Sequence, residues 1–574
     1  MPKLPSRIFS FLSKRWSLYG LAAAAVIACS LIPRLDQLGR GQSIAEAWVA
    51  NSVLAGSMRE MLYYDHWLQT SPPLFLMLVR FTVKILGASD VVLRAVPFTL
   101  GILAIAMLAR LAGKMLRPAF ALLCTCLIAF SPYGIAYSKE LKQYSSDMFA
   151  TCLVLWAIWT YIQSPTRRQY FVLLFVFAVT LFLSYTAIVF VPLAVLVVLL
   201  ETRPAASRGA GLAAFTGILG GINYFCFVRP NSSSTLTTFW AVGFPPAGWK
   251  NTFRFYLEHF APMPFYFYFT AGTGVQDTLR ARIEALPGII QAAAAIAALS
   301  AVALGVCSLR RRRSERYGLL FFIVPLLTLA AMNRDGLYPV SSRRLTLFML
   351  PCVVLASAAI LQSLWLYLRE RWIQLAPPLS PAMRICGIAA LLLGIAALSI
   401  HPGVWDIDTS DDGGMESVVR YLKAKVRPGY DLVYVHDWEE EPARLYLAIT
   451  GWKNAPVRFG HTGYPCCKRT AEKRPGDSDT ERDYVFNDFR NAIGQPPNGD
   501  LWLVLPDPRP EWGPAATDDP RIITSGMYGL GCSEEREKHF DSVNVYEFHC
   551  DGRRANRFVT IQRTTAPNRR QRRD

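Results

Sequence analysis

Polar and charged residues gather in four stretches, each beside a long apolar run. The first, from Asp36 to Pro73, contains acids, bases and a histidine, and the second, residues 131–147, reads SPYGIAYSKELKQYSSD. The third, 229–282, is rich in aromatic residues, and the fourth, 333–344, reads NRDGLYPVSSRR. Charge at the ends of apolar runs is costly unless it is paired or hydrated, so these stretches are candidates for function.

The arginine pair of the fourth stretch, Arg343 and Arg344, follows a Tyr-Pro turn. Two guanidinium groups side by side suit a phosphate that bridges a lipid and a sugar, because guanidinium binds phosphate oxygens in a bidentate manner. Two structural interpretations remain open. The arginines could anchor a helix at the membrane interface, and the second stretch could be a solvated helix end.

The elements that must position these stretches are membrane-spanning helices. The chain has 574 residues, of which 52% are hydrophobic, and its mean hydropathy is positive. Apolar runs long enough to cross about 30 Å of hydrocarbon recur from Trp16 to His401, whereas the last third is polar. We therefore expect a polytopic α-helical membrane protein with about eleven spans and a C-terminal α/β soluble domain.

The net charge of +18 does not indicate nucleic-acid binding, because the basic residues lie mostly in short gaps between apolar runs. Basic residues in such gaps set the orientation of the spans, because short loops with an excess of Lys and Arg stay on the cytoplasmic side. We expect the basic N-terminal arm to be cytoplasmic and the first span to be uncleaved, because the apolar run is long and no small-residue cleavage site ends it. An odd number of crossings then places the C-terminal domain outside, and the localisation expected is the bacterial inner membrane with a periplasmic C-terminal domain.

We expect three regions, the last of which is a basic, disordered tail at 553–574. The helical body covers 1–404, with outer-face loops at 34–91, 138–147, 229–283 and 333–344. The soluble domain covers 405–552, where a helix at 415–425 and the strands DLVYVH, LWLVLP and NVYEFHC indicate an α/β fold. An acid cluster after the first strand could bind a metal, although a solvated loop is favoured. Four cysteines could form up to two disulfides, one joining Cys532 to Cys550.

The order of several motifs carries a resemblance. The sequence PPLFLMLVRFTVKILGASDVVLRAVPFTLG precedes SPYGIAYSKELKQYSSD, a FW…FPP loop, GLYPVSSRRLTLFMLP and RYLKAKVRPGYDLVYV. Together they resemble bacterial membrane glycosyltransferases of the GT-C superfold, in the family 39 and dolichyl-phosphate-mannose-mannosyltransferase-like group. The resemblance covers roughly residues 16 to 450. It implies inverting transfer of a sugar from a polyprenyl-phosphate donor to an envelope glycan, lipid or protein at the outer membrane face.

Members of this group carry an Asp-Glu pair in the first outer loop, and the Asp is taken as the general base. The matching stretch here is SIAEAW, in which Glu46 fits the Glu but Ala45 occupies the Asp position. Alanine cannot accept a proton, so the catalytic candidates are Glu46, Asp36 and Asp65.

The resemblance also implies a cationic site for the leaving lipid phosphate and residues that position the substrates. Arg94 is a more distant cationic candidate. Asp147 could hold a divalent ion such as Mg²⁺ or Mn²⁺, but one carboxylate is a thin basis and no cofactor is certain. The candidates for the donor phosphate are Lys139, Lys142, Arg343 and Arg344, and the candidates for substrate positioning are His66, Gln69, Glu140, Tyr144 and Tyr338.

Two other functions remain open. The missing Asp fits a catalytically silent homologue that binds glycolipid or partners an active enzyme. A transporter would place ionisable residues near the middle of the membrane and carry an inverted repeat, and the sequence shows neither.

Overall fold

The structure is a computed structural model. It describes residues 6–64, 70–202, 205–232, 240–260, 313–340, 343–372, 414–436, 439–460, 489, 491–493, 499–506, 521–529, 532–540 and 543–549.

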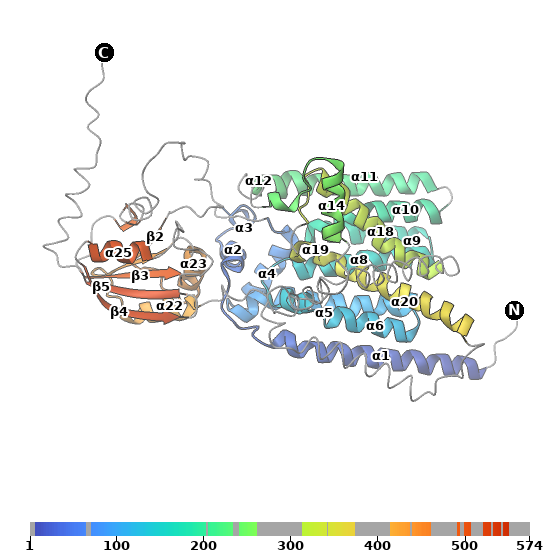
Figure 1. The fold of residues 1–574 in the computed structure, drawn as a ribbon, viewed down its shortest axis with the longest axis horizontal. Helices are drawn as coiled ribbons and strands as arrows, with labels where there is room; N and C mark the ends of the chain where they lie inside the picture. The colour runs from blue at the N-terminus through green and yellow to red at the C-terminus, as the bar shows by residue number, and fades with distance from the viewer. Residues whose placement is uncertain are drawn as a thin grey trace, which may run out of the picture.

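A bundle of roughly parallel helices forms the body of the molecule, and a small sheet with its helices lies at one end of it (Figure 1). The N-terminus lies at the opposite end of the bundle. The long helices of the body are α1 (Ser6–Leu35), α5 (Asp90–Met115), α6 (Pro118–Ala129), α8 (Tyr144–Gln163), α9 (Arg167–Leu183), α10 (Val191–Glu201), α11 (Ala205–Asn223), α18 (Arg313–Arg334) and α20 (Leu350–Trp372).

Shorter helices join the long ones, mostly at the end of the bundle that faces the sheet. In the described residues they include four 3₁₀ helices, at Tyr137–Lys139, Tyr185–Phe190, Ala241–Gly243 and Leu347–Met349, and a π-helical turn at Tyr224–Val228. The short α-helices are α2 (Ile44–Leu54), α3 (Met58–Leu62), α4 (Pro73–Leu86), α7 (Pro132–Ala136), α12 (Arg229–Asn231), α14 (Trp249–Phe260) and α19 (Arg343–Thr346).

Six helices in the described ranges are long and apolar enough to cross a membrane, and a bent pair formed by α6 with the segment 132–139 would make a seventh. This confirms the predicted polytopic helical body. The count of about eleven spans stays a prediction, because 261–312 and 373–413 lie outside the described residues. Helix α4 is not among the candidate spans, because its 14 residues are too few to cross a membrane.

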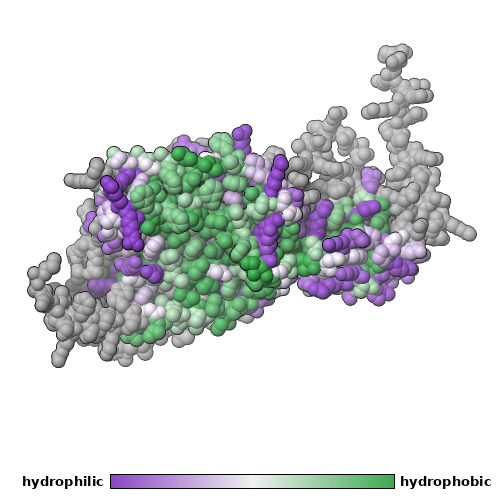
Figure 2. Space-filling view, turned by 180° about the vertical axis from the view of Figure 1, so that it is seen from behind, coloured by the Kyte–Doolittle hydropathy of each residue, from purple (hydrophilic) through white to green (hydrophobic). Residues whose placement is uncertain are grey.

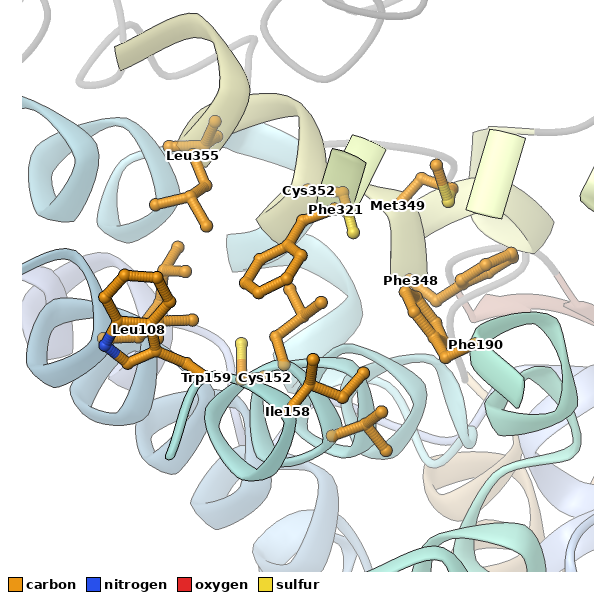
Figure 3. Close-up of a cluster of buried hydrophobic side chains, with 14 of the residues drawn as sticks. Leu108, Cys152, Ile158, Trp159, Phe190, Phe321, Phe348, Met349, Cys352 and Leu355 are labelled. Carbon is orange, nitrogen blue, oxygen red and sulfur yellow. The ribbon is translucent and has the colours of Figure 1, made fainter. Parts of the chain in front are cut away.

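The core of the body lies between α5, α8, α18 and α20 (Figure 3). Trp159 and Cys152 of α8 lie opposite Phe321 of α18 and Cys352 of α20. The rings of Phe190 and Phe348 meet edge to face with their centroids 6.2 Å apart. The surface of the body is also apolar, and its hydrophilic residues are concentrated toward the two ends (Figure 2). An apolar core inside an apolar belt is the pattern of a bundle that lies in lipid.

The C-terminal region forms a five-stranded sheet with the order β2-β1-β3-β5-β4. The first three strands in this order are parallel, and β5 pairs antiparallel with both β3 and β4. This confirms the predicted α/β fold. Cys532 is disulfide-bonded, while Cys550 and the basic tail lie outside the described residues. The elements are α22 (Met415–Lys425), β1 (Leu432–Val435), α23 (Glu440–Ile449), β2 (Val457–Phe459), β3 (Asp500–Pro506), α25 (Arg521–Gly529), β4 (Ser533–Phe540) and β5 (Val543–His549).

The sheet region and the membrane body share a second apolar core. Side chains of α2, α4 and the first turns of α5 pack in one cluster with those of α22, α23, β1 and β3. Polar contacts reinforce the junction, because the Tyr446 hydroxyl donates to Asp90 Oδ1 at 2.9 Å and accepts from the Gln42 amide at 2.8 Å. The α/β domain is thus packed directly against the segment that runs from Gln42 to the first turns of α5.

This junction can be tested by Tyr446→Phe, which removes the hydroxyl and leaves the ring. We expect the junction to weaken by about 1–2 kcal/mol, because Asp90 and the Gln42 amide each lose a buried partner. Limited proteolysis of the full chain in detergent should then release the α/β domain faster. Tyr430→Phe is the matched control, since Tyr430 is an exposed tyrosine of the same domain. Equal cleavage rates for both variants would contradict the assigned role.

Candidate functional site

The first turn of α2 holds Glu46 at the end of the bundle beside the α/β domain (Figure 1). Ser43 caps this helix: its hydroxyl accepts from the Glu46 amide at 3.3 Å, and Glu46 Oε2 accepts from the Ser43 amide at 3.1 Å. This reciprocal capping box fixes where the helix begins and which way Glu46 points. The Glu46 side chain is fully buried.

Arg94, from the first turns of α5, forms a buried ion pair with Glu46. Its Nε donates to Oε1 and its Nη2 to Oε2, both at 2.8 Å. The remaining N–H groups of Arg94 donate to the carbonyls of Leu38, Arg40 and Gly41. All five N–H donors of the guanidinium are therefore used.

A fourth donor completes the surroundings of Glu46. The Leu141 amide, in the segment between α7 and α8, donates to Glu46 Oε1 at 2.7 Å. Each carboxylate oxygen thus accepts two hydrogen bonds, which uses its full acceptor capacity. Burial opposes the charge of Glu46, but Arg94 and the other donors prevail and lower its pKa to about 2. The catalytic role predicted for Glu46 does not fit these contacts, because no lone pair is left for an acceptor hydroxyl.

The segment that carries Leu141 also brings two charged side chains beside the start of α2. The Lys142 amide donates to the Glu140 carbonyl at 2.7 Å, a tight turn that places these residues on either side of Leu141. Lys142 Nζ donates to the Ala45 carbonyl at 2.5 Å. Lys142 therefore contacts residue 45, the position at which the resemblance leads us to expect an Asp.

Glu140 interacts electrostatically with Lys142, Arg344 and Arg40 as well as with Glu46. Burial, followed by repulsion from Glu46, raises the pKa of Glu140, and the three cations oppose the rise. Burial lowers the pKa of Lys142 to about 7, with Arg344 acting in the same direction and the two glutamates against it. With Arg94, two acids and four cations lie close together, so their protonation states depend on one another.

Aromatic residues frame this cluster. Arg344 lies over the ring of Trp240, with its guanidinium carbon 5.1 Å from the ring centroid. Tyr144 is buried and meets Tyr137 edge to face, with the centroids 5.0 Å apart. The Tyr338 hydroxyl donates to the Leu345 carbonyl at 2.8 Å, which ties the fourth stretch to α19. We name Glu140, Lys142, Arg344 and Arg40, with the Glu46–Arg94 pair, the charge cluster.

Asp147 lies in the first turn of α8 and is buried beside the Ser184 hydroxyl. Within the described part of the chain, no group of three or more His, Cys, Asp or Glu side chains could hold a metal ion. Mg²⁺ and Mn²⁺ prefer several oxygen ligands, and Asp147 alone does not fit that requirement. We therefore derive no step through a metal at this position.

The structure brings together some of the predicted site residues and leaves others aside. Glu46, Glu140, Lys142 and Arg344 meet in the charge cluster, and Lys139 is buried close by in sequence. Asp36 is exposed in the turn after α1. Asp65, His66, Gln69 and the side chain of Arg343 lie outside the described residues.

Two sequence interpretations are corrected. Arg94 is not a distant cation but the direct partner of Glu46, and its place inside an apolar run was the signal for a buried pair. The acid cluster after β1 is not a solvated loop. Glu440 pairs with Arg444 at 2.6 Å, and Glu441 Oε2 accepts from Asn51 at 2.6 Å and from the Tyr64 hydroxyl at 3.1 Å. Glu441 thus joins α23 to α2 and to the segment after α3, whereas Glu440 pairs within α23.

Residues 70–222 match the family described as dolichyl-phosphate-mannose-protein mannosyltransferase. This confirms the resemblance for the segment that runs from α4 to α11. The match covers 153 of the 574 residues and includes Arg94, Glu140, Lys142 and Asp147. No curated protein matches the chain.

Among solved structures, ArnT from Cupriavidus metallidurans in the apo state is 12% identical, with a TM-score of 0.49 over 94% of this chain and 98% of that chain. The same protein bound to undecaprenyl phosphate is 12% identical, with a TM-score of 0.47 over 91% and 97%. The oligosaccharyltransferase from Archaeoglobus fulgidus is 11% identical, with a TM-score of 0.40 over 83% and 67%.

The Glu46–Arg94 pair predicts a strong effect of removing one charge. We expect Glu46→Gln to lower the stability of the protein by roughly 3–5 kcal/mol, because it leaves Arg94 buried without a counter-charge. The double variant with Arg94→Met should lose less than the sum of the two single variants. The measurement is the thermal midpoint of the detergent-solubilised protein.

Glu60→Gln is the matched control for this experiment. Glu60 makes the same capping contacts with Ser57 at the start of α3, but both hydrogen bonds are exposed. Its loss should therefore cost no more than about 1 kcal/mol. If the two glutamate variants were equally stable, the pair would not hold the fold together.

Proposed function

We propose that the chain is an integral membrane glycosyltransferase that transfers a sugar from a polyprenyl-phosphate donor to a cell-envelope glycolipid, polysaccharide or protein. The observation that carries the proposal is the charge cluster at one end of the helical body. Its central residues, Arg94, Glu140 and Lys142, lie within the segment that matches the mannosyltransferase family. At the end of a membrane bundle, a carboxylate can accept a proton and neighbouring cations can stabilise a departing lipid phosphate, as the proposed reaction requires.

The proposed reaction is an in-line displacement at the anomeric carbon of the donor sugar. The acceptor oxygen forms a bond to this carbon while the bond from the carbon to the phosphate oxygen breaks. A carboxylate takes the acceptor proton, and the electron pair of the broken bond leaves with the polyprenyl phosphate. Lys142 and Arg344 stabilise the negative charge that develops on this phosphate, as preorganised cations do most effectively in an enclosed site.

The proposed orientation places the charge cluster and the α/β domain on the periplasmic side of the bacterial inner membrane. Asp90, at the start of α5, contacts the α/β domain, whereas Lys114 lies in the last turn of the same helix. The basic end of α5 is thus the end far from this domain, which supports a cytoplasmic position for Lys114 and the N-terminus. We propose that the α/β domain caps the outer face and contributes to acceptor selection.

The direct test incubates the purified protein in proteoliposomes with polyprenyl-phosphate hexoses and pentoses and a bacterial envelope fraction as acceptor. We expect transfer of the labelled sugar together with release of polyprenyl phosphate. Lys142→Ala and Arg344→Ala should each lower kcat by roughly 100-fold or more, as the removal of one transition-state contact does elsewhere. Lys84→Ala is the control, because Lys84 lies in the last turn of α4 with an exposed side chain.

The outcomes separate the proposal from its alternative. If the wild-type protein bound the donors but transferred none of the sugars, it would be a catalytically silent homologue. If it bound no polyprenyl-phosphate sugar, both the proposed donor binding and the proposed sugar transfer would be refuted.

The pH dependence of donor binding follows from Lys142, whose pKa is lowered to about 7. Below this pKa the side chain is charged and attracts the phosphate, and above it the side chain is neutral. The phosphodiester of the intact donor keeps a single negative charge throughout this range. We therefore expect affinity to fall roughly tenfold between pH 6 and pH 9, corresponding to one lost charge-assisted hydrogen bond.

Lys142→Arg should remove this dependence, because arginine remains charged at every pH tested. The measurement is the Kd of the intact donor at steps across the pH range for both proteins. A slope of equal size in the arginine variant would exclude Lys142 as the titrating group.

A further inference from the structure

We propose that Glu140 is the general base of the transfer reaction, in place of the missing Asp at position 45. This inference rests on the proposed function and names the residue that takes the acceptor proton. A base in the charge cluster needs a carboxylate oxygen that accepts no hydrogen bond from the protein.

Two of the expected positions cannot supply the base. Ala45 has no proton-accepting group. Glu46 is adjacent, but its oxygens already accept from the Ser43 and Leu141 amides and from two nitrogens of Arg94. Freeing one of them would break the buried pair, so Glu46 serves as a fixed anchor that positions the segment around Leu141.

Glu140 has the opposite character. Its Oε2 is enclosed by the protein and accepts no hydrogen bond from any of the described residues. A buried carboxylate oxygen without a donor is costly, and such atoms are rare in folded proteins. A substrate hydroxyl that donated to Oε2 would supply the missing hydrogen bond.

Glu140 also lies near residue 45, where the Asp is missing. The turn from Glu140 to Lys142 lies against the start of α2, where Lys142 Nζ donates to the carbonyl of Ala45 itself. The carboxylate of Glu140 interacts with Lys142 and with Glu46, the two neighbours of position 45 in space and in sequence. Glu140 therefore provides a carboxylate in the charge cluster from the segment that faces the start of α2.

The electrostatic surroundings of Glu140 suit a group that gains and loses a proton, rather than one that stays ionised. Burial and Glu46 raise the pKa of Glu140, while Lys142, Arg344 and Arg40 keep the rise in check. A carboxylate with a raised pKa is a stronger base than a surface glutamate, provided that it is ionised at the working pH. In the proposed reaction the same cations neutralise the departing phosphate. Proton transfer to Glu140 and departure of the phosphate therefore take place in the same charge cluster.

The proton balance is simple. The acceptor hydroxyl gives its proton to Glu140 Oε2 as its oxygen bonds to the anomeric carbon, and the phosphate departs with the electron pair of the broken bond. Glu140 then returns the proton to water before the next turnover. No oxidant, reductant or other co-reactant is needed.

Other carboxylates are less suited to this role. Asp147 Oδ1 is also buried without a hydrogen-bond partner among the described residues, but Asp147 lies within the span α8 beside Ser184 rather than in the charge cluster. Asp36 is exposed in the turn after α1.

The test compares Glu140→Gln with the wild-type protein for donor affinity and for sugar transfer. We expect kcat to fall at least 100-fold while the Kd of the donor changes less than threefold. Adding Ala45→Asp to the Glu140→Gln variant should restore kcat at least tenfold, because it returns a carboxylate to the same cluster. Glu60→Gln, on the exposed start of α3, is the control and should match the wild type.

A second measurement covers the case in which Ala45→Asp disturbs the fold. Formate added to Glu140→Ala should raise its kcat in a concentration-dependent way, since a small carboxylate can enter the space left by the side chain. The rise of kcat/KM with pH that reports ionisation of Glu140 should disappear in Glu140→Gln. It should persist in Glu140→Asp.

The proposal is overturned if Glu140→Gln keeps wild-type kcat. It is also overturned if the variant loses donor binding together with transfer, because Glu140 would then hold the donor rather than the proton. An inactive wild-type protein would instead refute the proposed function, and sugar transfer by the wild type in the same assay identifies that case.

Discussion

The ion pair between Glu46 and Arg94 is the interaction on which the candidate site depends. It joins three segments far apart in the chain: the start of α2, the start of α5 and the turn before α8. Both partners are fully buried, so the pair is tolerable only because every donor and acceptor is used. This requirement fixes the geometry of the neighbouring residues, including the turn that presents Glu140 and Lys142.

The α/β domain is part of the same arrangement. Its helix α23 contacts α2 through Glu441 and contacts α5 through Tyr446. The apolar cluster beneath these contacts continues from the sheet into α2 and α4. A movement of this domain would therefore act on the helix that carries Glu46, which gives the domain a physical connection to the charge cluster.

Much of the fold could be predicted because the pattern of apolar residues is local. Helix α22 begins and ends where its amphipathic period indicates, and β1, β3 and β5 coincide with the expected apolar strands. Strands β2 and β4 were missed for opposite reasons. Strand β2 has only three residues, and β4 reads SEEREKHF, a charged edge strand without apolar alternation.

The sequence by itself determined which residue types were present: a Glu without its Asp, two lysines and a glutamate before a span, and an arginine pair before another. It also determined that they lie at the ends of apolar helices, since hydrophobic periodicity depends on neighbours in the chain. Only the tertiary structure decided which charges are used up in holding the fold and which remain available. Glu46 and Arg94 are 48 residues apart in sequence, and their mutual saturation depends on hydrogen bonds that no local pattern encodes. For the same reason the oxygens of Glu46 are fully hydrogen-bonded, whereas Glu140 Oε2 has no donor among the described residues.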